Sequence, residues 1–127
     1  MRSVRKPHAV QNSSSWVLSL VEDLGVGPVR DIGLLDSAVH RPRVSVFGRD
    51  AYPGLDDKAA VILESLVGND ALVDGNKRLG WLSLVVFYGL NGIDLDAPDD
   101  EAYDLVIAVA SGTATYQEVS ARLASWH

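Results

Sequence analysis

The chain of 127 residues contains no cysteine. Its sequence therefore excludes disulfide bonds, thiolate zinc sites and a cysteine nucleophile, and it fits a cytoplasmic protein. A long apolar run is also missing. The longest, residues 79–90, is interrupted by Gly80, Ser83 and Gly89 and is too short to cross a bilayer, so we expect no membrane contact. The basic start is not followed by an apolar segment with a small-residue cleavage site, so no signal peptide is predicted.

Positive charge is scarce. Eleven Lys and Arg residues stand against seventeen Asp and Glu residues, which gives a formal net charge of −6. No large basic stripe is present, so we expect no direct nucleic-acid partner. The one basic concentration, within residues 2–8, is expected in a flexible tail of residues 1–15. The hydrophobic fraction of 47% indicates that residues 16–127 form a single folded domain.

Apolar residues recur at helical spacing in several segments that glycine and proline separate. The pattern predicts helices over residues 16–24, 33–40, 56–68, 76–90, 98–111 and 115–126, the third capped by Asp56 or Asp57 and the last by the capping box Thr115-x-x-Glu118. Residues 41–54 are irregular, with at most a short extended piece. We therefore predict an all-α fold, a compact bundle of about six helices around a buried central helix. We assign that central place to residues 76–90, which are apolar on all sides.

The most informative stretch is Asp74-Gly75-Asn76-Lys77-Arg78, directly before the apolar helix. The N-terminal end of a helix presents unpaired N–H groups and a positive dipole end, so it attracts anions. Asn76 is expected to cap the helix, Gly75 to let the backbone approach a ligand, and Lys77 and Arg78 to add positive charge. Asp74 is suited to hold a divalent cation that bridges to the same anion. Together these residues predict a site for a metal-bound phosphate.

The same five residues also fit ordinary turn-and-cap chemistry with solvated charge, and spacing alone does not decide between the two interpretations. The glycine frame and the Lys-Ser/Thr end of a Walker A loop are absent, so that class of phosphate site is excluded.

The stretch 74–78 resembles the signature of the Fic/Doc (Fido) superfamily, in particular the branch of death-on-curing (Doc) toxins, whose motif reads His-x-Phe-x-Asp-x-Asn-Lys-Arg. Residues 33–39, Gly-Leu-Leu-Asp-Ser-Ala-Val, with Arg41-Pro42 resemble the early helix of that family. The helix that contains Lys58 stands where the family has its pre-motif helix. The resemblance covers about residues 24–126 and implies the compact helical Fic/Doc fold.

The resemblance also implies roles for the motif residues. Asp74 corresponds to the metal-binding acid, Gly75, Asn76 and Lys77 to the nest that holds nucleotide phosphates, and Arg78 to the arginine that pairs with a phosphate. Most Fic enzymes have glycine in place of Lys77 and transfer AMP. The lysine form is similar to Doc toxins, which use ATP and Mg²⁺ to transfer a phosphoryl group to translation elongation factor Tu. A Phd-type antitoxin is the implied partner, and the loop 43–54 lies where the family docks a target peptide by strand addition.

Two positions depart from the family motif. The catalytic histidine falls on Asp70 and the phenylalanine falls on Leu72. A carboxylate is a weaker base than histidine at neutral pH, and it would repel a triphosphate. We therefore expect lost or reduced transfer activity, although Asp70 also fits a solvated loop carboxylate. The three histidines, His8, His40 and His127, are expected at the surface and not as substitutes.

Other functions fit the same residues. The chain could be a Fic-fold binding module without catalysis, an AMP-transferring enzyme, or a helical scaffold with no ligand. Trp16, Phe47 and Trp126 are candidates to line an antitoxin groove, and each also fits an ordinary core position.

Overall fold

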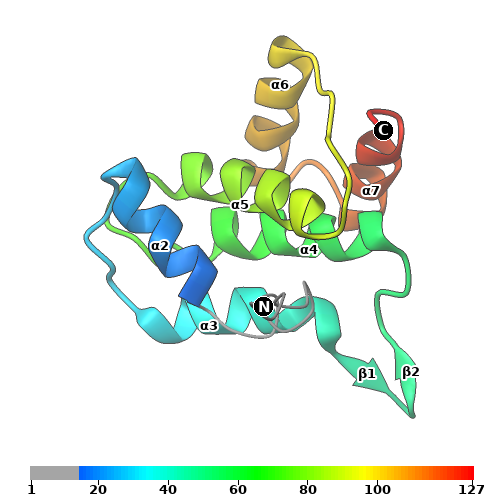
Figure 1. Ribbon diagram of the computed structural model, residues 1–127, viewed down its shortest axis with the longest axis horizontal. Coiled ribbons are helices and arrows are strands. Elements are labelled where there is room, and N and C mark those ends of the chain that lie inside the picture. Colours follow the sequence, from blue (N-terminus) through cyan, green and yellow to red (C-terminus); the bar gives the residue numbers. More distant parts are fainter. Residues whose placement is uncertain (1–14) are drawn as a thin grey trace, which may run out of the picture.

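The computed structural model describes residues 15–127 (Figure 1). This part of the chain forms six α-helices and one small β-hairpin, which confirms the predicted all-α fold. The elements are α2 (Ser15–Leu24), α3 (Ile32–His40), the 3₁₀ turn η1 (Arg41–Arg43), β1 (Ser45–Val46), β2 (Arg49–Asp50), α4 (Leu55–Gly68), α5 (Asn76–Leu90), α6 (Asp99–Ala110) and α7 (Tyr116–Ala124). Over residues 15–127, no helix has the length and apolar character that a membrane span requires.

The predicted tail of residues 1–15 is described only at its last residue, and Ser15 is already helical. Residues 1–14, with His8, lie outside the described part of the chain.

Helix α4 occupies the centre of the bundle. It packs against α3, η1, α5, α6 and α7, and eight of its fourteen residues are buried. Figure 1 shows α4 and α5 side by side across the middle, with α2 and α3 on one side and α6 and α7 on the other. The central place assigned to residues 76–90 was therefore wrong. Helix α5 is apolar on all sides because one side faces the core and another faces an open groove, where Trp81, Leu82 and Val85 are only partly buried.

The α4–α5 contact depends on a missing side chain. A Cβ atom at Gly80 would lie 2.7 Å from Cγ2 of Val67 and 3.2 Å from Cδ1 of Leu63. Carbon atoms pack at about 3.5–4 Å, so a larger residue would force the two helices apart. Gly80 thus fixes the spacing of the helices that flank the predicted site.

Side-chain caps are present at the N-terminal ends of α3 and α7. Asp31 caps α3 by accepting a hydrogen bond from the Gly33 N–H at 2.9 Å. The capping box of Thr115 and Glu118 at the start of α7 is complete. The caps were readable because each needs only residues two or three apart in the sequence.

The predicted cap of α4 was wrong. This helix begins at Leu55 after Gly54, and no side chain caps it. Asp56 lies in the first turn, where its carboxylate accepts a hydrogen bond from the Tyr88 hydroxyl. The hydrogen bond to Tyr88, 32 positions later in the sequence, thus takes the place of a local cap. A local sequence pattern does not reveal such a long-range contact.

The C-terminal end of α5 is closed by a polar cluster. Tyr88, fully buried, donates to Oδ1 of Asp56, and Nε2 of His127 lies 2.6 Å from the same oxygen. Burial, and then the hydrogen bond to Asp56, raise the pKa of Tyr88 above its ordinary value. The cluster ties the start of α4 to the end of α5 and to the last residue of the chain.

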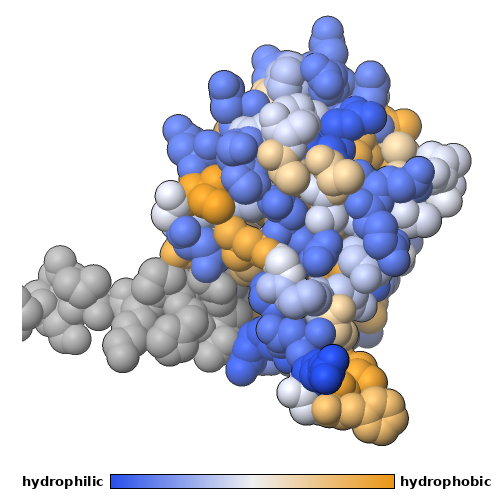
Figure 2. Space-filling view, turned by 90° about the vertical axis from the view of Figure 1, so that its right-hand side faces the viewer, coloured by the Kyte–Doolittle hydropathy of each residue, from blue (hydrophilic) through white to orange (hydrophobic). Residues whose placement is uncertain are grey.

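The irregular segment 41–54 contains the hairpin. Strands β1 and β2 pair antiparallel, and Phe47 sits at the turn with a positive φ of 52° and a fully exposed side chain. Figure 2 shows this apolar tip, which Val44, Val46 and Phe47 form, projecting from a largely hydrophilic face. Its base is fixed by Lys58, whose ammonium donates to the backbone oxygens of Pro42 (3.1 Å) and Tyr52 (2.6 Å).

Of the three aromatic residues considered for an antitoxin groove, Trp16 and Trp126 are buried in the core and only Phe47 is exposed. The Trp126 ring meets Trp81 edge-on, with 6.3 Å between centroids. The ordinary core interpretation therefore holds for both tryptophans.

Candidate anion-binding site

The predicted motif lies in the loop 69–75 and the first turn of α5. Main-chain hydrogen bonds tie this loop to the segment between α2 and α3. These bonds run from Gly27 N–H to Asp74 O (3.1 Å), from Val73 N–H to Pro28 O (2.9 Å), and from the Arg30 and Asp31 N–H groups to Ala71 O (2.7 and 3.1 Å). The loop is therefore held in place before any ligand arrives.

Gly75 has a role in the fold that the sequence did not reveal. Its φ of 93° is in the left-handed region, and a Cβ atom there would lie 2.5 Å from Cγ1 of Val26. Both facts require glycine at this position. Gly75 therefore has a packing role against the 26–31 segment, and the expectation that it lets the backbone approach a ligand stays a prediction.

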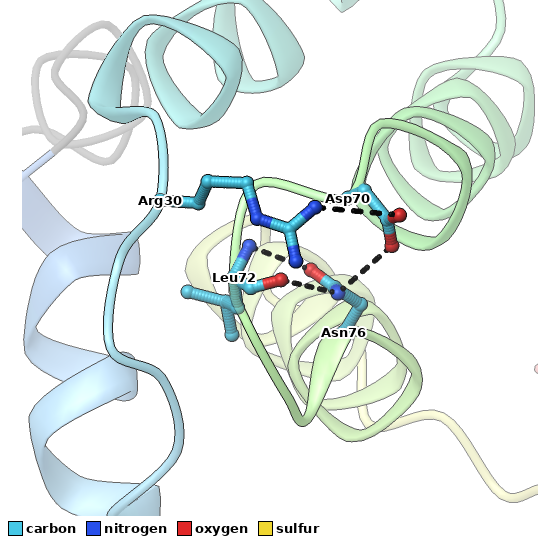
Figure 3. Close-up of polar contacts among 4 residues, drawn as sticks. All are labelled: Arg30, Asp70, Leu72 and Asn76. Atoms are coloured by element: carbon cyan, nitrogen blue, oxygen red, sulfur yellow. Dashed lines mark hydrogen bonds and ion pairs between the residues drawn. The ribbon is translucent and has the colours of Figure 1, made fainter.

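Asn76 is the first residue of α5 and not its cap, which corrects the predicted role of its side chain. Its Oδ1 accepts from the Leu72 N–H at 3.0 Å, and its Nδ2 donates to Leu72 O at 3.0 Å and to Oδ1 of Asp70 at 3.3 Å (Figure 3). Gly75 takes the N-cap position without a side-chain bond. The side-chain amide of Asn76 makes all these bonds within the loop, so only the backbone N–H of Asn76 is available to a ligand.

The N-terminal end of α5 carries unused donors. The helical hydrogen-bond ladder starts with Leu79 N–H, which donates to Gly75 O at 2.9 Å. Among residues 15–127, no protein oxygen accepts from the N–H groups of residues 75–78. Lys77 and Arg78 are exposed, and within the same described range neither makes an ion pair. This is the arrangement that attracts an anion.

These groups line one polar pocket of about 510 Å³. All six residues predicted for the site meet there, namely Asp70, Asp74, Gly75, Asn76, Lys77 and Arg78, together with Val67, Val73 and Ala110. The structure thus brings the predicted residues together, and their chemical roles remain predictions.

An apolar groove of about 550 Å³ adjoins the polar pocket. Trp81, Leu82 and Val85 of α5 face Tyr103 and Ile107 of α6 across it, and Lys77 and Arg78 line both cavities. The sequence analysis missed this groove. The available signal was the surplus of apolar residues around α5, which is more than one core face requires.

Asp74 is the predicted magnesium ligand, and it lines the polar pocket. In the part of the chain that the structure describes, no cluster of three or more His, Asp or Glu residues could hold a metal ion. Mg²⁺ is commonly held by one or two carboxylates with the remaining ligands from water and substrate phosphates. A single carboxylate beside a phosphate pocket fits that pattern, in which the metal enters with the phosphorylated ligand.

Comparison with known proteins agrees with the geometry. The family model described as Fic/DOC family matches residues 8–88, more than half of the chain. The chain belongs to the Fic/DOC family. A curated relative named Toxin Doc, from Mycolicibacterium smegmatis (strain ATCC 700084 / mc(2)155), is 49% identical over 100 residues, which cover 77% of each chain. The resemblance to the Doc branch is thereby confirmed.

In this Fic/DOC chain, the carboxylate of Asp70 contacts two other side chains. Asp70 has a positive φ of 56°, its Oδ2 lies 3.8 Å from Nη1 of Arg30, and its Oδ1 accepts from Asn76 (Figure 3). Asp70 is thus an exposed loop carboxylate, as the alternative above expected, with Arg30 and Asn76 as protein partners. Arg30 was not predicted, because it lies 40 positions before Asp70 and outside any motif that the sequence offered.

The hairpin lies beyond the far end of α4 from the motif loop (Figure 1). The helix between them has 14 residues, a length of about 21 Å at 1.5 Å per residue. Docking of a target strand along the hairpin remains a prediction, and it requires a target long enough to reach the pocket. His40 bonds the Asp36 backbone oxygen and His127 contacts Asp56, so neither stands in for the family histidine.

Proposed function

We propose that this chain is a Doc-type toxin of a toxin–antitoxin pair, with a polar pocket that holds the phosphates of ATP. Membership of the Fic/DOC family and the similarity to a protein named Toxin Doc support a toxin. The observation that carries the phosphate assignment is local: the unengaged N–H groups of residues 75–78 and the two unpaired cations share one pocket. A polyphosphate needs such donors, and little else in this part of the chain provides them.

In this proposal, the backbone N–H groups and Lys77 bind phosphate oxygens, Arg78 pairs with a phosphate, and Asp74 holds Mg²⁺ together with the ligand. Bound ATP and Mg²⁺ would supply the transferable phosphoryl group and neutralise its charge. The protein's contribution is positioning, which the preformed loop supports. The proposed acceptor is a hydroxyl of translation elongation factor Tu in the cytoplasm.

Asp70 is expected to weaken transfer. The residue at this position should accept the proton of the target hydroxyl, and geometry for that step requires a free acceptor within hydrogen-bond reach. Both carboxylate oxygens of Asp70 already face protein donors, so a target hydroxyl must compete with Arg30 and Asn76. The expected activity is low but recoverable.

The proposed partner is a Phd-type antitoxin. The apolar groove is suited to the apolar face of a segment that folds on binding, and it shares Lys77 and Arg78 with the polar pocket. A segment in the groove would therefore cover the cations that the phosphates need. Val85→Asn should abolish capture of a Phd-type antitoxin while leaving anion binding unchanged, because it places a polar but uncharged side chain in the groove.

The deciding experiment is the Asp70→His variant. We expect it to arrest growth when expressed and to transfer label from γ-labelled ATP to translation elongation factor Tu, while the unmodified chain does so weakly or not at all. Asp70→His combined with Arg78→Ala is the matched control and should be inactive. Transfer from α-labelled ATP instead of γ-labelled ATP would indicate AMP transfer.

The contacts of the Asp70 carboxylate with Arg30 and Asn76 also favour a second candidate function, that of a binding module without catalysis. That candidate predicts that Asp70→His binds Mg-ATP but remains harmless and transfers nothing. A plain scaffold predicts no thermal shift with Mg-ATP in any variant.

A further inference from the structure

Arg30 touches the motif loop with both its main chain and its side chain. Its backbone N–H donates to Ala71 O at 2.7 Å, and its guanidinium Nη1 lies 3.8 Å from Oδ2 of Asp70. Figure 3 shows the side chain reaching over the loop from the segment between α2 and α3. One residue from outside the motif therefore contacts two consecutive residues of the loop, of which Asp70 lines the polar pocket.

Asp70 places a negative charge where an anion is expected to bind. It lines the polar pocket with Lys77 and Arg78, whereas Arg30 does not line it. Arg30 meets Oδ2 and Asn76 meets Oδ1, so the carboxylate is held from two sides. Any influence of Arg30 on a ligand in this pocket passes mainly through Asp70.

We propose that Arg30 is a positioning residue for the polar pocket, which offsets the charge of Asp70 and holds its carboxylate so that a phosphate can bind beside it. The inference uses the proposed function only in taking the pocket as a phosphate site. Opposite charges a few ångströms apart cancel much of each other's field, so a phosphate meets a nearly neutral pair instead of a bare carboxylate. Without Arg30, the carboxylate is free to turn toward the ligand and repel it.

The pair contributes little to folding. The side chains of Arg30 and Asp70 are 54% and 71% exposed, and exposed ion pairs contribute little to stability. Arg30→Ala also keeps the backbone bond to Ala71. The residue should therefore affect anion binding without affecting unfolding, which separates a positioning role from a structural one.

A double-mutant cycle tests the proposal. The proteins are the unmodified chain, Arg30→Ala, Asp70→Asn and the double variant, with Arg30→Lys as the charge-retaining control. Asparagine is a fitting replacement because it tolerates the positive φ of residue 70. Inorganic pyrophosphate with Mg²⁺ is the probe, and calorimetric titration measures its affinity.

We expect Arg30→Ala to weaken pyrophosphate binding about three- to tenfold in the presence of Asp70 and less than about twofold in the Asp70→Asn background. Arg30→Lys should retain most of the affinity. The coupling should shrink as salt rises, because exposed charges are screened. Urea unfolding of all five proteins should give the same midpoint.

Equal losses in both backgrounds would mean that Arg30 attracts the anion directly, and that result would overturn the proposal. No loss in either background, or no pyrophosphate binding by the unmodified chain, would overturn it too. If the cycle behaves as expected but Asp70→His neither arrests growth nor transfers label, the proposed function fails and the role of Arg30 stands. If Asp70→His is active and the cycle shows no coupling, the reverse holds.

Discussion

The two ends of helix α5 are built in opposite ways. At its N-terminal end, the N–H groups of residues 75–78 and the cations of Lys77 and Arg78 face a polar pocket, unengaged by protein in the described range. At its C-terminal end, the Tyr88 hydroxyl is buried and bonded to Asp56, which His127 also contacts. In the described part of the chain, one end leaves its polar groups without protein partners, and the other pairs them within the fold.

Because of this difference, substitutions at the two ends of α5 should have different effects, one on ligand affinity and the other on stability. Polar groups open to water cost the fold little, so their removal should change ligand affinity and leave unfolding unchanged. Buried, paired groups leave an unsatisfied partner behind when one is removed, so their removal should change unfolding and leave the ligand unaffected.

Gly75 lies at the N-terminal end of α5 and also packs against Val26. Its replacement should cause the largest loss of stability. Gly75→Ala introduces a methyl group into Val26 at a positive φ, and we expect a loss of about 3 kcal/mol in the free energy of unfolding. Gly92→Ala is the control, because its φ is also positive, at 80°, but nothing lies within 4 Å of its Cβ position. Its cost should be about 1 kcal/mol. Equal losses in urea unfolding would show that the Val26 contact is unimportant.

Arg78→Ala should affect the open end alone. We expect pyrophosphate affinity to fall about tenfold, equivalent to about 1.4 kcal/mol, because one charge-assisted contact is lost. The unfolding free energy should stay within about 0.5 kcal/mol of the unmodified chain. A large loss of stability in denaturant titration would place Arg78 with the structural residues instead.

Tyr88→Phe should affect the closed end alone. The variant loses the hydrogen bond to Asp56, and we expect about 1 kcal/mol less stability with unchanged pyrophosphate affinity. Tyr103→Phe, at an exposed residue of α6, is the matched control and should be neutral in the same urea titration. A change in anion affinity on Tyr88→Phe would show that the two ends are coupled.

The smallest expected effect is a change in the free energy of unfolding at alkaline pH. The pKa of Tyr88 is raised in the folded protein, so this hydroxyl keeps its proton where the unfolded chain loses it, near pH ~10. Its contribution is therefore complete below that pH and declines as pH rises further. The stability difference between the unmodified chain and Tyr88→Phe should shrink by less than about 1 kcal/mol between pH 8 and pH 10.5. A difference that grows over this range would contradict the assignment.

Much of the fold could be predicted because its signals are local. Helix spans follow from apolar spacing, and the caps at Asp31 and Thr115 need only neighbouring residues. The central place of α4 could not be predicted from local patterns, because it depends on how the other helices pack around it. Local apolarity does not distinguish a core face from an open groove.

The same limit applies to the site. The residues of the motif 74–78 line one pocket, as expected of a shared site, and their roles stay predictions. The predicted capping role of the Asn76 side chain was wrong, because this side chain bonds Leu72 and Asp70. The contact of Gly75 with Val26 was not predicted, because it depends on tertiary structure. Arg30 was invisible, since only tertiary structure brings the segment before α3 against the loop after α4.

Lys77 and Arg78 form the shared wall of the polar pocket and the apolar groove. A charged occupant of one compartment would therefore change the electrostatic potential in the other without any backbone movement. A peptide whose carboxylates reach this wall would compete with an anion by charge, whereas a neutral peptide of the same shape would leave the anion in place. The affinity of a charged compound for one cavity should therefore depend on whether the other cavity is occupied.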